Sequence, residues 1–473
     1  MASHALAAFL LGAFAHCAAD EPSRVSSEAA FTAPAGLTVA NDRIFFGAFR
    51  PSTGFELWVS DGTEAGTREV KDIRNGFRGS YPTFISEFRA RVFFTADDGQ
   101  TGLELWSSDG TAQGTSPVLD IQRGSGASMP SALTVAGDYL YFVANDGTHG
   151  HELWRTRGSA ETTALVADIS PGLASSTPRH LTAAGNLLFF VAHDPDAGTE
   201  VWLTDGTQTG TRRVSDINPG PLDTNVHSLT VLHDFVAVVA ADQDHGIELW
   251  RTDAKADTQL IKDIRPGLSA SRPRYLQRLQ DHLYFQADDG KHGYELWRTD
   301  GTSRGTQPVK DIRPGLESSL PSHLVAAGNS LFFAATDATH GVELWRSDGT
   351  SAGTRIVGEI NPGPDSASPG QLTAIDQILY FAAGSPSHGW ELWRTDARGQ
   401  FLSLVGDARP GKESSYPNQI IPFGSGVAFV ADDEHGQARL WISDREGLRR
   451  LGDPPLTQSS PETSPLRSGT SAR

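Results

Sequence analysis

The stretch His292–Thr302, with the sequence HGYELWRTDGT, returns along almost the whole chain. Its tryptophan recurs every 48 residues, with a single interval of 47, at Trp58, Trp106, Trp154, Trp202, Trp250, Trp297, Trp345, Trp393 and Trp441. A fixed period in this range is typical of propellers, solenoids and repeat arrays. Nine units of about 48 residues account for residues 31–453, so the repeat decides the fold.

One unit contains four runs with the character of short strands. In the unit after Pro130 these runs span residues 132–136, 139–144, 151–156 and 164–169. Each run is bounded by Gly, Asn, Asp or Pro and lacks a helical period. Four short antiparallel strands in each repeat predict an all-β protein, a β-propeller of four-stranded blades. We predict nine blades in one ring, with an eight-bladed ring plus one extra unit as the alternative.

The turn between the third and fourth strands carries a second motif, Asp-Gly-Thr-x-x-Gly-Thr. Aspartate and threonine side chains bond to nearby backbone N–H groups, and glycine permits a tight reversal. The turn resembles the Asp-box hairpin of sialidases and related propellers, which implies a structural role. Five units carry the intact motif, at residues 61–67, 109–115, 205–211, 300–306 and 348–354.

The two motifs together resemble a family of bacterial secreted proteins named for its Glu-Leu-Trp-x-x-Asp-Gly-Thr repeat. Seven units keep Glu-Leu-Trp, whereas Glu200-Val201-Trp202 and Arg439-Leu440-Trp441 depart from it. The resemblance covers about nine-tenths of the chain and implies a secreted or surface-attached repeat protein. It implies no particular reaction. The hairpin motif is degraded in four units, at residues 157–159, 253–255, 396–398 and 444–446.

The N-terminal segment predicts export to the periplasm or outer surface of a bacterium. The apolar run at residues 5–15 is too short to span a bilayer, and Cys17 and Ala19 precede Asp20 at a cleavage-like spacing. We therefore predict a signal peptide over residues 1–19 and a linker over residues 20–30. An acylated Cys17 is the alternative, and only then do we expect membrane attachment. The Ser/Thr/Pro-rich residues 454–473 predict a disordered tail.

Charge and cysteine content exclude several classes of function. The formal net charge is −18, with acids in every repeat, and such a negative field repels nucleic acid. The repeats contain no cysteine, because Cys17 is the single cysteine of the sequence. Disulfides, cysteine–zinc sites and thiol nucleophiles are thereby excluded from the body of the protein.

Acidic turns before the third strand are the candidate metal ligands. Oxygen-rich loops of this kind are able to hold Ca²⁺, although calcium loops usually carry more acids at alternate positions. A solvated surface turn is the competing interpretation, and we expect no other cofactor. The candidate residues are Asp97, Asp98, Asp288, Asp289, Asp432 and Asp433.

Repeated side chains are poor candidates for catalysis, which needs a single place. We expect each strand glutamate, such as Glu56, to bond to the backbone or an arginine of the neighbouring blade. Gly349–Gly353 fits Gly-x-Ser-x-Gly but lacks the strand–turn–helix context of a nucleophile elbow. We expect the repeated histidines to cap their own turns, since one ion cannot reach six blades. These histidines are His149, His245, His292, His340, His388 and His435.

These observations favour an exported, non-enzymatic binding or scaffold module for a protein or glycan. The alternative is a glycan hydrolase or lyase whose site lies at the mouth of the central channel, and a third class is a purely structural envelope component. A function that needs one place requires positions at which the units differ. The fifth unit differs most, at residues 225–229 and His233.

Overall fold

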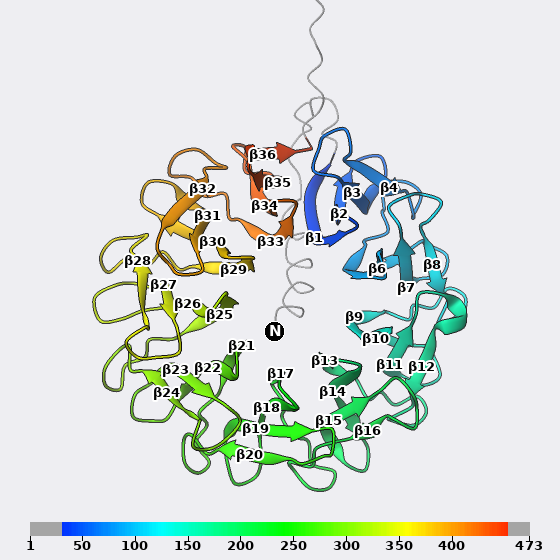
Figure 1. Ribbon diagram of the computed structural model, residues 1–473. Helices are drawn as coiled ribbons and strands as arrows, with labels where there is room; N and C mark the ends of the chain where they lie inside the picture. The colour runs from blue at the N-terminus through cyan, green and yellow to red at the C-terminus, as the bar shows by residue number, and fades with distance from the viewer. Residues whose placement is uncertain (1–30, 453–473) are drawn as a thin grey trace, which may run out of the picture.

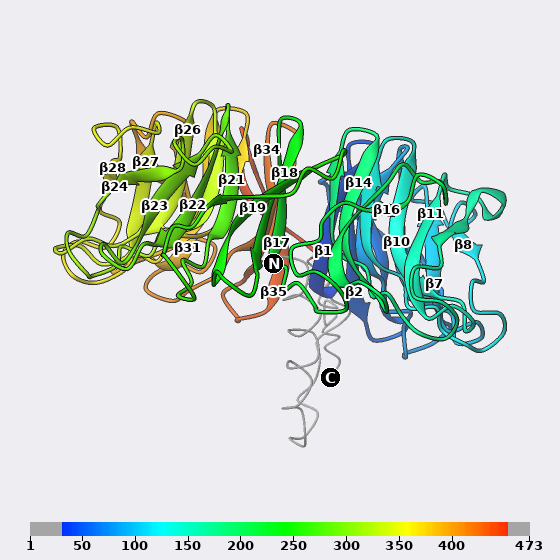
Figure 2. The same cartoon turned by 90° about the horizontal axis from the view of Figure 1, so that it is seen from below.

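A computed structural model describes residues 31–452 as nine four-stranded antiparallel sheets. The sheets stand side by side around a central opening and form a nine-bladed β-propeller (Figure 1). Viewed from the edge, the ring is a single disc of upright blades (Figure 2). The prediction of nine blades in one ring is confirmed, and the alternative of eight blades plus an extra unit is wrong.

The first strand of each blade lines the opening (Figure 1). These innermost strands are β1 (Thr32–Ala40), β5 (Thr83–Phe88), β9 (Ser131–Ala136), β13 (Arg179–Ala184), β17 (Ser228–Leu232), β21 (Arg274–Leu279), β25 (Ser322–Ala327), β29 (Gly370–Ile375) and β33 (Asn418–Phe423). We number the blades 1 to 9 in this order.

The second and third strands form the buried middle of each blade. The second strands are β2 (Arg43–Arg50), β6 (Arg91–Asp97), β10 (Tyr139–Asn145), β14 (Leu187–Asp194), β18 (Phe235–Ala241), β22 (His282–Asp288), β26 (Ser330–Ala335), β30 (Ile378–Ser385) and β34 (Gly426–Asp432). The third strands are β3 (Gly54–Ser60), β7 (Leu103–Ser108), β11 (His151–Thr156), β15 (Gly198–Thr204), β19 (Ile247–Asp253), β23 (Tyr294–Thr299), β27 (Glu343–Ser347), β31 (Gly389–Asp396) and β35 (Ala438–Asp444).

The fourth strands form the rim of the disc and are short. They are β4 (Arg68–Lys71), β8 (Ser116–Leu119), β12 (Ala164–Ala167), β16 (Arg212–Arg213), β20 (Gln259–Lys262), β24 (Gln307–Lys310), β28 (Arg355–Gly358), β32 (Leu402–Gly406) and β36 (Gly447–Leu451). One 3₁₀ turn, Ala160–Thr162, is the only helix in residues 31–452. Within that range no helix is long and apolar enough to cross a membrane.

The hydrophobic core is divided into layers between neighbouring blades. In the layer between blades 1 and 2, Phe45 and Val59 from blade 1 pack with Phe94 and Trp106 from blade 2. Trp106 is 4% exposed, so the repeated tryptophans build the core, as predicted. Burying one large side chain contributes about 1.5–3 kcal/mol, so each layer adds to the cohesion of the ring.

The intact Asp-Gly-Thr hairpins hold the third strand to the fourth through side-chain bonds. In blade 7, Asp348 Oδ1 accepts bonds from Thr350 N at 3.0 Å and Thr350 Oγ1 at 2.7 Å. Gly353 N donates to Thr350 Oγ1 at 3.0 Å. The predicted role of this motif as a structural fastener is confirmed. Gly349–Gly353 lies in this hairpin and not in a strand–turn–helix.

Each strand glutamate holds the loop that leads to the next blade. Glu56 is fully buried and accepts bonds from Arg74 N at 3.2 Å and Ser80 Oγ at 2.5 Å. Glu295 repeats this arrangement, with Ile312 N at 3.0 Å and Ser319 Oγ at 2.6 Å. The prediction of a structural role with backbone partners is confirmed, but the partners lie in the connection that leaves the same blade, and no arginine side chain takes part in these bonds.

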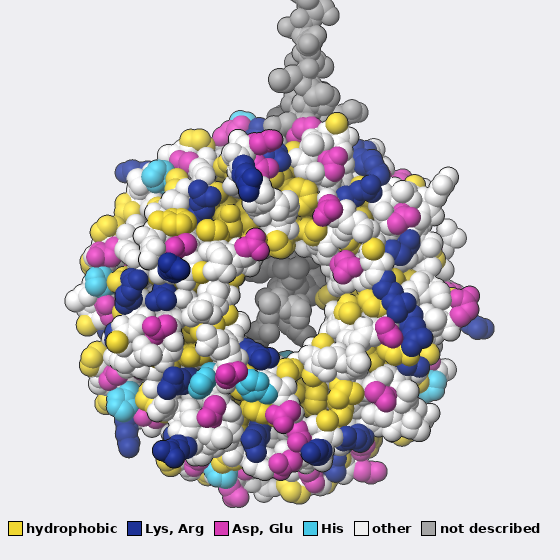
Figure 3. Space-filling model, viewed as in Figure 1, with side chains coloured by type: hydrophobic (Ala, Val, Ile, Leu, Met, Phe, Trp, Pro, Cys, Tyr) yellow, Lys and Arg dark blue, Asp and Glu magenta, His cyan; other side chains and the backbone are white. Residues whose placement is uncertain are grey.

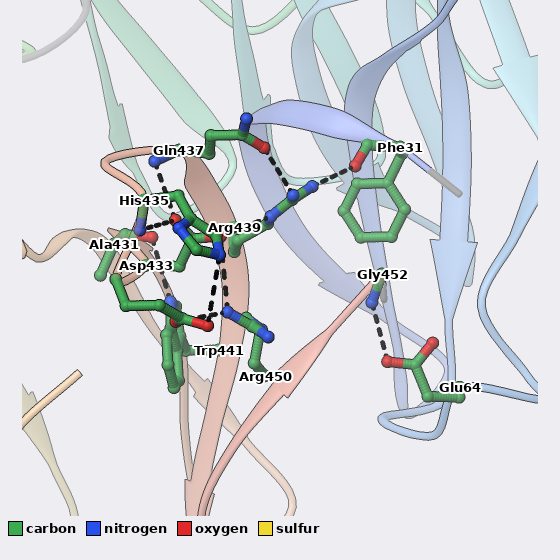
Figure 4. Close-up of polar contacts among 11 residues, drawn as sticks. Phe31, Glu64, Ala431, Asp433, His435, Gln437, Arg439, Trp441, Arg450 and Gly452 are labelled. Atoms are coloured by element: carbon green, nitrogen blue, oxygen red, sulfur yellow. Dashed lines mark hydrogen bonds and ion pairs between the residues drawn. The ribbon is translucent and has the colours of Figure 1, made fainter. Parts of the chain in front are cut away.

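The ring closes between blades 9 and 1 without exchanging a strand, because every described sheet uses four consecutive strands. Arg439 stands where the other blades carry the buried glutamate, and it donates to Phe31 O at 2.9 Å (Figure 4). Asp433 neutralises this guanidinium at 3.1 Å, and both side chains are buried. Gly452 N donates to Glu64 Oε1 at 2.8 Å. The departure from Glu-Leu-Trp in blade 9 therefore marks the closing joint.

The predictions for residues 1–30 and 454–473 lie outside the described residues. They concern the signal peptide, acylation of Cys17, the linker and the C-terminal tail.

Candidate functional site

Two of the predicted calcium ligands are ion-paired with arginines of the preceding connection. Asp97, at the end of β6, pairs with Arg74, and Asp288, at the end of β22, pairs with Arg265. In each case the arginine follows the fourth strand of the previous blade. These carboxylates therefore join adjacent blades.

The other predicted calcium ligands bond within their own turns. Asp98 Oδ1 accepts from Gln100 N at 2.8 Å, and Asp289 contacts His292 Nδ1 at 2.9 Å. Asp433 belongs to the closing joint, and burial raises the pKa of the adjacent Asp432. Within residues 31–452, no group of three or more His, Cys, Asp and Glu side chains is arranged to hold a metal. Calcium binding at these turns stays a prediction.

The repeated histidines cap the turns in which they lie. His149 Nδ1 contacts Asp146 Oδ2 at 2.7 Å, and His340 Nδ1 contacts Asp337 Oδ2 at 2.9 Å. The hydrogen bond that His149 Nδ1 donates to Asp146 raises the pKa of His149, and the pKa of Asp146 is lowered to about 2. The interpretation as turn caps is confirmed for His149, His245, His292 and His340, whose rings contact an aspartate of their own turn.

The innermost strands are where the blades differ in chemistry. One position of the repeat, spaced 48 residues apart with one interval of 47, lies at or near the start of each innermost strand. Three adjacent blades carry basic or titratable side chains there: Arg179 in blade 4, His227 just before β17 in blade 5, and Arg274 in blade 6. The other six blades carry the small or neutral residues Ala35, Thr83, Ser131, Ser322, Gly370 and Asn418.

We call Arg179, His227 and Arg274 the basic arc. Strands β13, β17 and β21 contact one another in sequence, so the arc occupies about one third of the channel wall. Burial and the charge of Arg274 lower the pKa of His227. Its Nε2 atom is buried and has no hydrogen-bond partner in the described part of the chain. Asp223 lies within electrostatic reach of Arg179.

Aromatic side chains continue the arc at the next position along the strands. The rings of Tyr275 and His323 lie 5.9 Å apart, on the adjacent strands β21 and β25. Tyr275 is exposed, although it is a large aromatic residue. His323 is accessible to solvent, but the neighbouring atoms of the channel wall displace part of the water around its ring. This partial desolvation lowers the pKa of His323.

Blade 5 differs from the others in backbone as well as in sequence. Strand β17 pairs with β18 without a register shift, whereas each of the other eight innermost strands has at least one. His227 N donates to Val239 O at 2.8 Å and fixes this regular pairing. The divergence noticed in the sequence at residues 225–229 is therefore a real change in the channel wall. His233 lies in the next turn, 3.6 Å from Asp281 of blade 6.

A pocket of about 400 Å³ adjoins the arc between blades 3 and 4. Arg179 lines it together with His151 and the segment Thr177–Pro178. Figure 3 views the ring from the opposite face, where the turns after β17 and β21 carry histidine, acidic and basic side chains on the rim of the opening. Arg179, Arg274, Tyr275 and His227 together offer cationic, aromatic and hydrogen-bonding groups that suit a polar, negatively charged ligand.

Sequence reasoning found His227 but missed Arg179 and Arg274. The signal was present, because the three residues fall at one position of the repeat once the single 47-residue interval is allowed for.

Residues 189–364 match the family model described as outer membrane protein assembly factor BamB. This match covers less than half of the chain and includes parts of blades 4 to 7. No curated protein matches the chain.

Among solved structures, the chain is similar to a puromycin hydrolase S511A mutant complexed with PGG, with 14% identity and a TM-score of 0.41. That match covers 88% of this chain and 61% of the hydrolase. The β-propeller domain of the Trilobed protease from Pyrococcus furiosus matches with 13% identity and a TM-score of 0.35, over 68% of this chain and 96% of the domain. The chain thus spans less than two thirds of the hydrolase.

Proposed function

We propose that the protein is an exported binding or scaffold module that holds a negatively charged protein segment or glycan at the channel mouth. The basic arc carries this proposal. Three neighbouring blades place Arg179, His227 and Arg274 at one position, in a chain whose formal net charge is −18. A local cationic surface attracts anions, whereas the acidic remainder of the molecule repels them, so an anionic ligand is directed to the arc.

The repeated side chains support binding over catalysis. The strand glutamates and turn histidines bond to their own loops in blade after blade, so neither set forms a single reactive centre. The match to the BamB family model over residues 189–364 supports an interaction role. The matched residues include His227 and Arg274 of the basic arc.

Export and family membership form the second part of the proposal. The Glu-Leu-Trp-x-x-Asp-Gly-Thr repeats and the apolar run at residues 5–15 support a secreted or envelope-attached bacterial protein. Mass spectrometry of the mature N-terminus tests this part. We expect a chain that begins at Asp20; a diacylated Cys17 would instead place the protein on a membrane, and an unprocessed Met1 would argue against export.

A binding screen tests the role of the arc. We expect the protein to bind acidic glycans or acidic peptides on an array, and neutral ones much less. The double variant Arg179→Gln/Arg274→Gln should weaken binding at least tenfold, because charge-assisted hydrogen bonds are lost. Arg304→Gln, which removes an exposed arginine of an intact hairpin, serves as the matched control. Equal binding by the double variant and the control would refute the role of the arc.

The second candidate function is a lyase acting on an acidic glycan. His227 supports it, because a neutral imidazole beside Arg274 is suited to remove a proton next to a carboxylate that the arginine holds. Incubation with uronate polysaccharides, followed by ultraviolet detection of unsaturated sugars, tests this candidate. Turnover that His227→Gln abolishes while binding persists would favour the lyase over the pure binding module.

A further inference from the structure

A second, separate pocket lies between blades 7 and 8. Its volume is about 440 Å³. Three arginines line it, Arg346 from β27, Arg355 from β28 and Arg398 from the β31–β32 hairpin. The amide side chains of Asn329, Gln377 and Gln400 also line it. The two turns that carry Asn329 and Arg398 lie on the same face, opposite the face where the innermost strands begin, so the pocket is distinct from the basic arc.

The three guanidinium groups of this arginine pocket form no ion pair in the described part of the chain. Arg346 Nε donates to Ser330 Oγ at 2.9 Å, and Arg355 has one long contact of 3.5 Å with Ile356 O. Arg398 is exposed. The nearest acids are otherwise engaged, since Asp348 bonds to Thr350 and Asp396 Oδ1 accepts from Gln400 N at 2.7 Å. Arg346 still lowers the pKa of Asp348 from a distance.

Other joints use the same arginine position as a brace. Arg298 of blade 6 donates to Gly349 O in the hairpin of blade 7 at 3.0 Å, and Arg251 of blade 5 reaches Gly301 O of blade 6 at 3.4 Å. The equivalent partner of Arg346 is Ala397 in blade 8. No such bond joins Arg346 and Ala397 within the described residues, so its terminal nitrogens remain available.

The degraded hairpin of blade 8 explains the missing brace. Gly399 N donates to Asp396 O at 2.9 Å and closes a short turn. Because the turn is short, the pairing of β31 with β32 extends by one residue pair, Thr395 with Leu402. The intact hairpin of blade 7 begins its ladder one step later, at Arg346 and Arg355. The tighter turn also places Arg398 at the edge of the pocket. Figure 3 shows Lys and Arg side chains gathered over β27 and β28.

From this geometry we infer that the arginine pocket binds an acidic sugar, with a carboxylate held by the arginines and hydroxyl groups held by the amides. Guanidinium groups match carboxylates with two parallel hydrogen bonds, and side-chain amides both donate to and accept from hydroxyls. The pocket volume is larger than one small oxyanion requires and falls within the range of ligand sites. The source is a free uronate or the terminal residue of a uronate polymer.

Isothermal titration with glucuronate, glucose and inorganic phosphate tests this inference. We expect glucuronate to bind and glucose not to bind. Arg346→Gln and Arg398→Gln should each weaken glucuronate binding at least tenfold, and raised salt should weaken it further because the pocket is open to solvent. A titration with polygalacturonate distinguishes the two sources. A site for a free sugar binds the monomeric uronate alone, whereas a site for a chain end binds both the monomer and the polymer.

Two controls keep the result separate from folding and from the channel site. Arg304→Gln should leave glucuronate binding unchanged, and circular dichroism should show all variants folded. Arg179→Gln/Arg274→Gln should also leave it unchanged, so failure at the basic arc and failure here are distinguishable. Phosphate binding without glucuronate binding, no binding at all, or glucuronate binding that survives both pocket substitutions would each overturn the inference.

Discussion

A single side chain of reversed charge distinguishes the closing joint from the other joints. Arg439 occupies the glutamate position in blade 9, where the backbone carbonyl of Phe31 in blade 1 lies within hydrogen-bond distance. A carbonyl needs a donor, which arginine supplies and glutamate does not, and Asp433 compensates the buried positive charge.

We predict that Arg439→Glu, which restores the repeat consensus, destabilises the protein by about 3–5 kcal/mol. The substitution leaves Asp433 buried beside a second acid and removes the bond to Phe31. Urea unfolding measures the change. Arg445→Glu, at an exposed position of the neighbouring hairpin, should change the free energy of unfolding by less than about 0.5 kcal/mol. Equal effects of the two substitutions would show that the joint does not depend on this side chain.

The buried glutamates predict an unusual dependence of stability on pH. Burial raises the pKa of Glu56 and of Glu391 from 4.5 to about 7, against the opposing effect of their hydrogen bonds. The folded state therefore binds protons that the unfolded state has released between pH 4.5 and about 7. By linkage, stability falls as pH rises through this window.

We expect Glu56→Gln to make that fall shallower, by about 1–3 kcal/mol between the two ends of the window. Free energies of unfolding measured at several pH values supply the comparison. Glu446→Gln removes an exposed carboxylate of the blade 9 hairpin and should leave the slope as it is. If both variants keep the slope of the original protein, Glu56 is ionised in the folded state.

At the scale of the element, the Asp-Gly-Thr hairpin depends on a glycine that has no room for a side chain. A Cβ atom on Gly353 would overlap the carboxylate of Asp348. We predict that Gly353→Ala destabilises the protein by about 2–4 kcal/mol, measured by thermal unfolding. Gly370→Ala is the control, because no atom lies within 4 Å of an added Cβ there and its φ is not positive. A Gly353→Ala variant as stable as this control would contradict the fastener role.

The acidic turns make a prediction about calcium. Asp97 and Asp288 already face Arg74 and Arg265, so we expect a chelator such as EGTA to leave the melting temperature unchanged. Differential scanning calorimetry in chelator and in millimolar Ca²⁺ checks this expectation. A melting temperature that rises with Ca²⁺, and does so less in an Asp98→Asn/Asp289→Asn variant, would instead identify the turns as calcium sites.

The strands were predictable from the sequence because each is a short apolar run between turn residues. The predicted run 139–144, for example, lies within β10. Local chemistry also defined the hairpins and the histidine caps. The arginine pocket was not predictable from the sequence. It forms because the tighter turn at Asp396–Gly399 in blade 8 leaves Arg346 of blade 7 without the carbonyl partner that the equivalent arginines have. Contacts between units depend on their arrangement in space, which the spacing of motifs does not contain.

At the scale of the whole molecule, nine similar joints distribute the stability evenly around the ring, and differences are confined to a few places. The basic arc covers blades 4 to 6, the arginine pocket lies at the joint of blades 7 and 8, and the charge-reversed joint lies between blades 9 and 1. Repetition supplies the scaffold, and local departures from it supply the candidate binding sites.

The absence of strand exchange has a consequence for how the chain is threaded. Each described blade is built from one continuous segment of the chain. New termini can therefore be placed in another connection between blades, and the described ends joined, without interrupting any sheet. We expect a circular permutant that starts at Pro130 and links Gly452 to Phe31 through a flexible peptide to fold into the same disc, observable by electron microscopy and calorimetry. A permutant that fails to fold would mean that assembly must begin at blade 1. The same modularity offers a simple route by which recombination between repeats adds or removes a blade.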